Sequence, residues 1–186
     1  MIDDLVSDKK YIDVQIPLRQ IEVLKAAADL SYGGPPDYEK SVVGHISKAL
    51  GIGKKTVGTH LYRMYDRLEV RDIFSAVYEA LHRGIISPAE VANGSLSDLI
   101  VSLEKLSRRE REVFRAFADM ALSSRDKGKA QVKEILDIAD RTLRNHKTRI
   151  YGRLEIHNNA QLAVAAYILS HSQVRQIVDK SHSYAA

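Results

Sequence analysis

Apolar residues recur along this chain at the spacing expected for amphipathic α-helices. The stripes consist of Val57, Leu61, Met64, Tyr65 and Leu68; of Ile73, Val77, Ala80 and Leu81; of Val113, Phe114, Phe117 and Leu122; and of Leu162, Ala166 and Leu169. Strict alternation of apolar and polar residues, which would indicate a half-buried strand, is not evident. The pattern therefore predicts an all-α fold.

Polar, Gly-containing and Pro-containing segments divide the chain. Residues 32–37 and 124–129 are expected to be loops, and 93–95 is expected to be a domain boundary. Between the two halves, Ser87-Pro88 is typical of a helix start, and residues 96–103 also have a helical pattern, so the connection is expected to be stiff. Ser107 and Glu110 have capping-box spacing, which predicts a helix from about residue 108. The expected domains are 1–93 and 94–186.

The two halves contain similar sequences in the same order. Residues 16–24 resemble 106–114, and residues 50–60 resemble 136–146. The second match continues without a gap, so that the residues at 63, 65, 67, 68 and 69 reappear as Arg149, Tyr151, Arg153, Leu154 and Glu155. An ungapped match of this length indicates an internal duplication.

At these residues the chain resembles the LuxR-type (GerE-like) helix-turn-helix family, over roughly 16–84 and 106–171. The resemblance rests on the Arg-x-x-Glu-Val opening at 109–113, on the Leu-Gly-Ile turn at 50–52, and on Thr-Val/Leu-x-x-His at 56–60 and 142–146. It implies two tandem four-helix helix-turn-helix domains, each with a recognition helix for the major groove of double-stranded DNA.

The resemblance also implies that the fourth helix of each copy makes a dimer contact. These helices are expected near 73–83 and 159–171. They could pair within one chain, which would give a monomeric pseudo-dimer, or between chains, which would give a homodimer.

The chain departs from the family pattern at several positions. Asp137 replaces the Gly of the turn in the second copy, and Pro17 replaces the opening Thr in the first. Both loops between the first and second helices are longer than the family's. Gly58 stands where the family often has a Lys that enters the groove. Within these 186 residues we expect no sensor or phospho-acceptor domain ahead of either copy.

The second recognition helix has a polar face suited to DNA. That face consists of Arg141, Thr142, Arg144, Asn145, Thr148, Arg149 and Arg153. No acidic residue lies between 141 and 153. Arg can form two hydrogen bonds with guanine, and Asn can do the same with adenine. By resemblance Arg144, Asn145 and Thr148 read bases, whereas Arg141 and Thr142, near the helix start, suit phosphate.

The first recognition helix offers a different polar face. Its expected DNA-binding residues are Lys54, Lys55, Thr56, Thr59, Tyr62, Arg63 and Arg67. Lys54 and Lys55 are natural phosphate contacts. Gly58 makes no side-chain contact and costs about 1 kcal/mol relative to Ala inside a helix. It marks either a close approach of the backbone to DNA or a degenerate site.

Charge is unevenly distributed between the halves. Residues 1–93 carry 12 Lys/Arg and 13 Asp/Glu, a net charge of −1, whereas residues 94–186 carry 16 and 11, a net charge of +5. This split favours a polyanionic partner for the second half. The chain has no Cys, and its His residues lack a metal-site spacing, so we predict no metal, no cofactor and no enzymatic activity.

Taken together, these features predict a sequence-specific transcription regulator that binds double-stranded DNA through both copies. The alternative is an interaction protein that uses the helix-turn-helix fold to bind RNA polymerase or to titrate a related regulator. A cytoplasmic location is expected, because residues 1–10 lack the apolar core of an export signal and no apolar run is long enough to cross a membrane.

Overall fold

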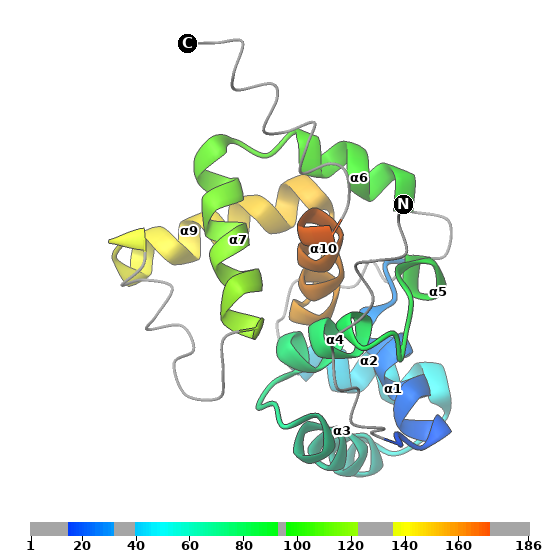
Figure 1. Cartoon of the computed structure of the whole chain (residues 1–186). Helices are drawn as coiled ribbons and strands as arrows, with labels where there is room; N and C mark the ends of the chain where they lie inside the picture. Colours follow the sequence, from blue (N-terminus) through cyan, green and yellow to red (C-terminus); the bar gives the residue numbers. More distant parts are fainter. Residues whose placement is uncertain (1–14, 32–39, 93–95, 123–135, 172–186) are drawn as a thin grey trace, which may run out of the picture.

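A computed structural model describes residues 15–31, 40–92, 96–122 and 136–171 (Figure 1). In the N-terminal half its helices are α1 (Leu18–Ala28), α2 (Lys40–Leu50), α3 (Lys54–Leu68) and α4 (Ile73–His82). The connection contains α5 (Pro88–Ala92) and α6 (Leu96–Glu104), and the C-terminal half contains α7 (Arg108–Leu122), α9 (Asp140–Leu154) and α10 (Asn159–His171). No strand occurs in these ranges, and the predicted all-α fold is confirmed.

Local capping explains where several helices begin. The capping box is present, with the Ser107 N–H donating to Glu110 Oε2 at 2.8 Å and the Glu110 N–H donating to Ser107 Oγ at 3.3 Å. Helix α5 begins at Pro88 as predicted, and the Ser87 N–H donates to the Glu90 carboxylate. The side chain of Asp72 accepts from the Ser75 N–H and caps α4. Both predicted loops, 32–37 and 124–129, lie outside the described residues.

The apolar stripes predicted from the sequence face the core wherever their side chains are described, while the side chains of Phe117 and Leu122 lie outside the described residues. Val57, Leu61, Met64 and Leu68 of α3 are buried, and Tyr65 is half-buried. The stripe of α4 is buried, and so are Val113 and Phe114 of α7. Helix α10 goes beyond its predicted stripe, because it is apolar on nearly every side and buried from Ala160 to Ala166. Such a helix belongs at the centre of a core rather than at its surface.

The two fourth helices pair within the chain. Helix α10 packs on α4 and also contacts α7, α6 and α1. The contact of α10 with α1, the first helix of the other half, has its counterpart in the contact of α4 with α7. The contacts between the two halves therefore run in both directions.

Side chains strengthen this pairing. The ring of Tyr78 on α4 meets that of Tyr167 on α10 edge-on, with 5.8 Å between centroids. The side-chain amide of Gln161 is fully buried and donates to the backbone carbonyl of Asp29, at the end of α1. The buried apolar residues form one continuous core across both halves. The division into domains 1–93 and 94–186 stays a prediction, and Asn93 itself is not described.

The two turns that precede α3 and α9 share an unusual backbone conformation. Gly51 has φ 63° and Asp137 has φ 48°, both in the left-handed region. Gly adopts this region without strain, whereas in other residues the Cβ makes it unfavourable. The free-energy cost is smaller for Asp than for most residues. The turn geometry explains why Gly suits the position in the first half and why Asp is a tolerable replacement in the second.

We expect Asp137→Gly to raise the free energy of unfolding by about 1 kcal/mol, because it relieves the left-handed backbone. Gly51→Ala is the matched opposite change. A Cβ at Gly51 would meet no atom within 4 Å, so only its φ would oppose the substitution. Urea unfolding should show the two variants shifted in opposite directions. A neutral or destabilising Asp137→Gly would mean that the aspartate side chain stabilises the turn.

The shared core also makes a prediction about the separated halves. Fragments 1–93 and 94–186 would each expose the apolar face of α4 or α10 to water, so each alone should self-associate or lose helicity. Mixed together, they should form a 1:1 complex with the helix content of the intact chain. Size-exclusion chromatography with light scattering and circular dichroism would measure this. Two folded, monomeric fragments that ignore each other would contradict the shared core.

Candidate nucleic-acid interface

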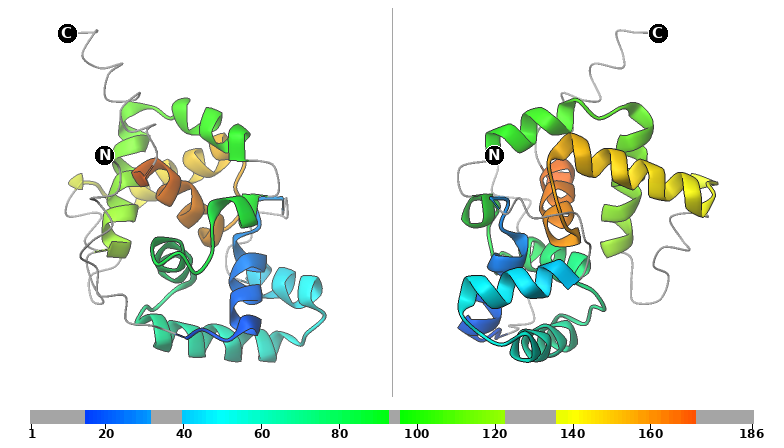
Figure 2. Two further views of the ribbon diagram at one scale, coloured as in Figure 1. Left: turned by 45° about the vertical axis from the view of Figure 1, so that its right-hand side comes forward. Right: turned by 180° about the vertical axis from the view of Figure 1, so that it is seen from behind.

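Helices α3 and α9 each turn one face outward. Figure 2 shows α9 in the upper part of the molecule and α3 along its lower edge, with α10 and α4 between them. On α9 the residues Leu143, Ile150, Tyr151 and Leu154 are buried. Its predicted DNA-binding residues are all exposed, namely Arg141, Thr142, Arg144, Asn145, Thr148, Arg149 and Arg153.

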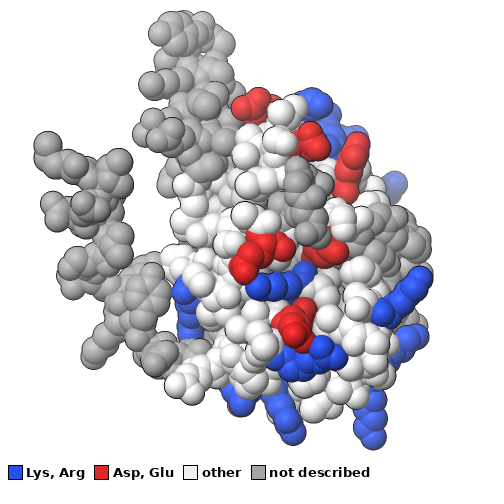
Figure 3. Space-filling model, turned by 90° about the vertical axis from the view of Figure 1, so that its right-hand side faces the viewer, with Lys and Arg blue, Asp and Glu red and all other residues white. Residues whose placement is uncertain are grey.

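The outer face of α3 is equally accessible. Exposed there are the predicted residues Lys54, Lys55, Thr56, Thr59, Tyr62, Arg63 and Arg67. Tyr62 stands out, because 75% of it is exposed although it is a large aromatic residue. In Figure 3, Lys and Arg side chains gather along the lower edge of the molecule, the level at which α3 lies in Figure 1, while Asp and Glu lie higher on that face.

Two of the predicted residues turn back toward the protein. Arg67 Nη1 donates to Gln20 Oε1 at 2.7 Å, and Gln20 is buried on α1. Arg153 is the counterpart in the other half, with Nε 3.4 Å from Oε1 of the buried Glu110 and Nη1 donating to the Lys105 carbonyl at 2.7 Å. Each arginine therefore fastens the last turn of its helix to the first helix of the same half. Their contact with DNA stays a prediction.

The remaining cations of the two outer faces are unengaged. Within the described part of the chain, no side-chain hydrogen bond or ion pair occupies Lys54, Lys55, Arg63, Arg141, Arg144 or Arg149. Each face thus offers three free positive charges to an anionic partner. The hydroxyls of Thr59 and Thr148 donate to backbone carbonyls one turn earlier, at 3.1 Å, so in this structure they satisfy their own helices.

A second pair of arginines holds the backbone just before α3 and α9. Arg19 Nη2 donates to the Leu50 carbonyl at 3.1 Å, and Arg109 Nη2 donates to the Leu136 carbonyl at 2.8 Å. Carbonyls at helix ends lack partners within the helix, so each guanidinium satisfies one of them. The sequence interpretation assigned no role to these arginines. The available signal was their identical place in the two opening blocks.

The shared tyrosines and histidines mainly pack. Tyr151 is buried, as expected for a core residue, and its hydroxyl donates to Asn159 Oδ1 at 2.6 Å. The Lys147 ammonium donates to the same oxygen at 2.8 Å. His60 and His146 each bury Nδ1 without a hydrogen-bond partner among the described residues. In these ranges no three His, Asp or Glu side chains gather into a metal site.

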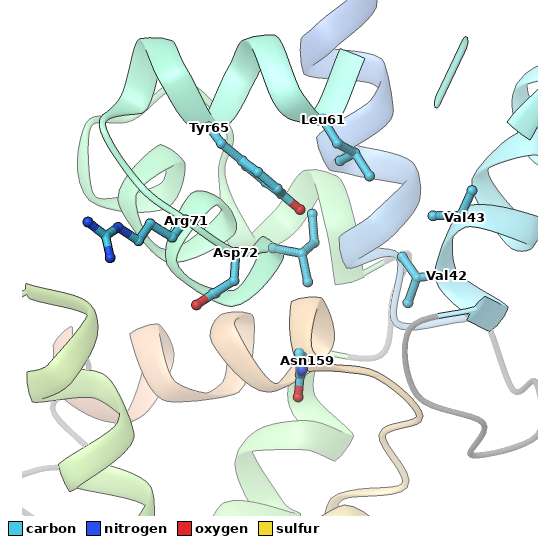
Figure 4. A pocket seen from close by; sticks show the side chains of 8 residues that line it. Val42, Val43, Leu61, Tyr65, Arg71, Asp72 and Asn159 are labelled. Atoms are coloured by element: carbon cyan, nitrogen blue, oxygen red, sulfur yellow. The ribbon is translucent and has the colours of Figure 1, made fainter. Parts of the chain in front are cut away.

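A small cavity of about 250 Å³ lies where the two halves meet (Figure 4). Its walls are mainly aliphatic, with Val42 and Val43 from α2 and Leu61 from α3, and the ring of Tyr65 points into it. Asn159 closes the side formed by α10, while the guanidinium of Arg71 points away. Ligand pockets usually measure about 300–1,000 Å³, so we assign no cofactor to this space.

Comparison with known proteins places one segment in a family. Residues 104–166 match the model of the family GerE, described as bacterial regulatory proteins, luxR family. No curated protein and no solved structure matches the chain. The matched segment contains α7, α9 and all the predicted DNA-binding residues of the C-terminal half. The match at residues 104–166 supports a DNA-binding helix-turn-helix regulator in general. None of the described helices is long and apolar enough to cross a membrane.

Among the described residues, Glu110 is the only acidic residue that is buried, and its environment keeps it charged. Burial alone would raise the pKa of Glu110, but the Ser107 N–H and hydroxyl and the positive charge of Arg153 outweigh burial and hold the pKa below its usual value. A depressed pKa in the folded state stabilises the protein above the unfolded value of about 4.3. That stabilisation disappears as the pH falls through the folded value.

We expect Glu110→Gln to lower the free energy of unfolding by about 1–3 kcal/mol at pH 7, because a charged acceptor of the capping box and of Arg153 is lost. Below pH 4 the difference from the wild type should shrink, since the wild-type carboxyl then becomes protonated. Urea unfolding across this pH range would measure it. Glu104→Gln, an exposed carboxylate at the end of α6, is the control and should have little effect at any pH. A constant deficit at all pH values would assign the loss to packing instead of charge.

Proposed function

We propose that this protein is a sequence-specific regulator of transcription that binds double-stranded DNA through two helix-turn-helix modules, with α3 and α9 as recognition helices. The observation that carries the proposal is the outer face of α9. There Arg144 and Asn145 are exposed above a buried apolar face, inside the segment that matches the LuxR family. A helix of this kind presents side chains to the major groove while the other face holds it to its domain.

The second module rests on contacts that recur in both halves. The bond from Arg19 to the Leu50 carbonyl has its counterpart in Arg109 and Leu136, and the anchor of Arg67 on α1 has its counterpart in Arg153 and α7. The turn before α3 has the same left-handed residue as the turn before α9. These parallels support α1–α4 as a second LuxR-type module, although the family match covers 104–166.

The exposed residues divide into two roles. In α9, Arg144 and Asn145 suit hydrogen bonds with guanine and adenine in the major groove, and Arg141 near the helix start suits phosphate. In α3, Lys54 and Lys55 suit phosphate, which adds affinity for any sequence. Arg67 and Arg153 contribute mainly by orienting the helices, because their donors are engaged by Gln20, Glu110 and Lys105.

The pairing of α4 with α10 determines how a duplex would be read. Modules related by a two-fold axis meet half-sites in inverted orientation, whereas modules related by translation meet direct repeats. The outer faces of α3 and α9 differ in sequence, so the two inverted half-sites should differ too. One chain would then act as a pseudo-dimer with a fixed spacing between its modules.

The pairing also bears on the alternative function. A protein that titrates a related regulator through the fourth helix would need that helix to be accessible. Here α4 and α10 are buried against each other, and Tyr78 and Leu162 have almost no exposed surface. This observation favours DNA as the partner over a related regulator. As part of the proposed function, we expect the protein to act in the cytoplasm, where its DNA would be.

The test begins with selection of bound sequences from random duplex DNA. On the preferred site, Arg144→Ala and Asn145→Ala should each weaken binding by about 1–3 kcal/mol, and they should leave binding to random DNA nearly unchanged. Lys54→Ala is the comparison variant and should weaken binding to both DNAs and reduce the salt slope by about 1. Fluorescence anisotropy at several salt concentrations would measure all three.

Two results would count against the proposal. Equal losses on preferred and random DNA would remove Arg144 and Asn145 from base reading. Absence of salt-dependent binding to any duplex would reject DNA binding and restore the interaction protein as the leading function.

A further inference from the structure

Gly58 occupies the outer face of α3 for no reason found in the protein itself. It lies inside a regular helix, it is exposed, and a Cβ built there would meet no atom within 4 Å. Its backbone is not in the left-handed region that calls for glycine. Because glycine is less favourable than alanine inside a helix, the fold by itself would prefer a side chain at this position.

Basic and aromatic side chains flank Gly58 on the outer face of α3. Lys54 and Lys55 lie one turn before it, and Tyr62 lies one turn after it. These side chains are exposed, and Tyr62 presents a largely apolar ring with 75% of the residue exposed. Bare backbone beside an exposed aromatic ring suits a small apolar group that approaches the helix closely. In α9 the equivalent of Gly58 is Arg144, so the two helices present different surfaces at this position.

Building on the proposed function, we propose that Gly58 and Tyr62 read the C5-methyl group of thymine in the N-terminal half-site. The bare backbone at Gly58 lets α3 approach the base edges, and the ring of Tyr62 packs on the methyl. This methyl is the apolar group that the bases display in the major groove. The free charges of Lys54, Lys55 and Arg63 lie near Gly58 and favour binding of a polyanion over binding of an apolar protein surface. The protein thus reads one half-site by apolar contact and the other by hydrogen bonds.

The first experiment separates stability from binding with Gly58→Ala. The variant should gain about 2–4 °C in Tm, because alanine is the better helix former, and should bind the preferred site about tenfold more weakly, because the methyl group blocks the close approach. Gly44→Ala is the control outside α3 and α9, since Gly44 lies inside α2 and a Cβ there would also meet nothing within 4 Å. It should gain stability without this loss of affinity.

The second experiment removes the thymine methyl from the DNA. Deoxyuridine in place of thymidine in the N-terminal half-site should weaken wild-type binding about three- to tenfold, as expected for one buried methyl group. Gly58→Ala and Tyr62→Ala should be much less sensitive to the same replacement. The substitution in the C-terminal half-site is the control for general effects of uracil.

The outcomes distinguish this inference from the proposed function. If Asn145→Ala still weakens binding but neither Gly58→Ala nor deoxyuridine does, the DNA-binding function stands and the thymine contact is wrong. If no duplex is bound at all, the proposed function fails, and the thymine contact fails with it.

Discussion

The burial of α10 is the interaction on which the rest of this structure depends. It is apolar on nearly all sides and contacts α4, α7, α6 and α1, so it belongs to the core of both halves at once. Its alanines at 160, 163, 165 and 166 let neighbouring helices approach closely. Fully burying a side chain such as Leu162 or Ile168 is worth about 1.5–3 kcal/mol. Removing this helix would therefore dismantle the relation between the halves as well as the fold of one of them.

The packing of the two halves on each other fixes their relative position, which a flexible linker alone would not do. The apolar faces of α4 and α10 are buried against each other within one chain. Helices α5 and α6 of the connection add further contacts. The helices α3 and α9 are thereby held on either side of the α4–α10 pair (Figure 2). A ligand that engages both helices pays little additional entropy for ordering them, since their relative position is already set by packing.

The two halves of the chain have similar internal contacts but different outer faces. These contacts are the guanidinium bonds to the Leu50 and Leu136 carbonyls and the arginine anchors near the ends of α3 and α9. Even there the chemistry has diverged, because Gln20 accepts as a neutral amide and Glu110 as a charged carboxylate. The exposed positions differ more, with Gly58 and Tyr62 in one half and Arg144 and Thr148 in the other. Packing constrains the residues that position a helix, whereas the identity of an exposed residue can change to suit a ligand.

The sequence by itself determined the helices and the outward faces of α3 and α9, because helical periodicity and capping are local properties of the chain. The capping box at Ser107 and Glu110 and the helix start at Pro88 needed no tertiary information. The roles of Arg67 and Arg153 needed it, since each side chain lies on an exposed helix yet reaches a partner more than 40 residues away. Only the tertiary structure decided how the fourth helices pair. The hydrophobic effect is non-directional, so an apolar helix face can be buried equally well by pairing within a chain or between chains. The packing of the whole fold decides between the two.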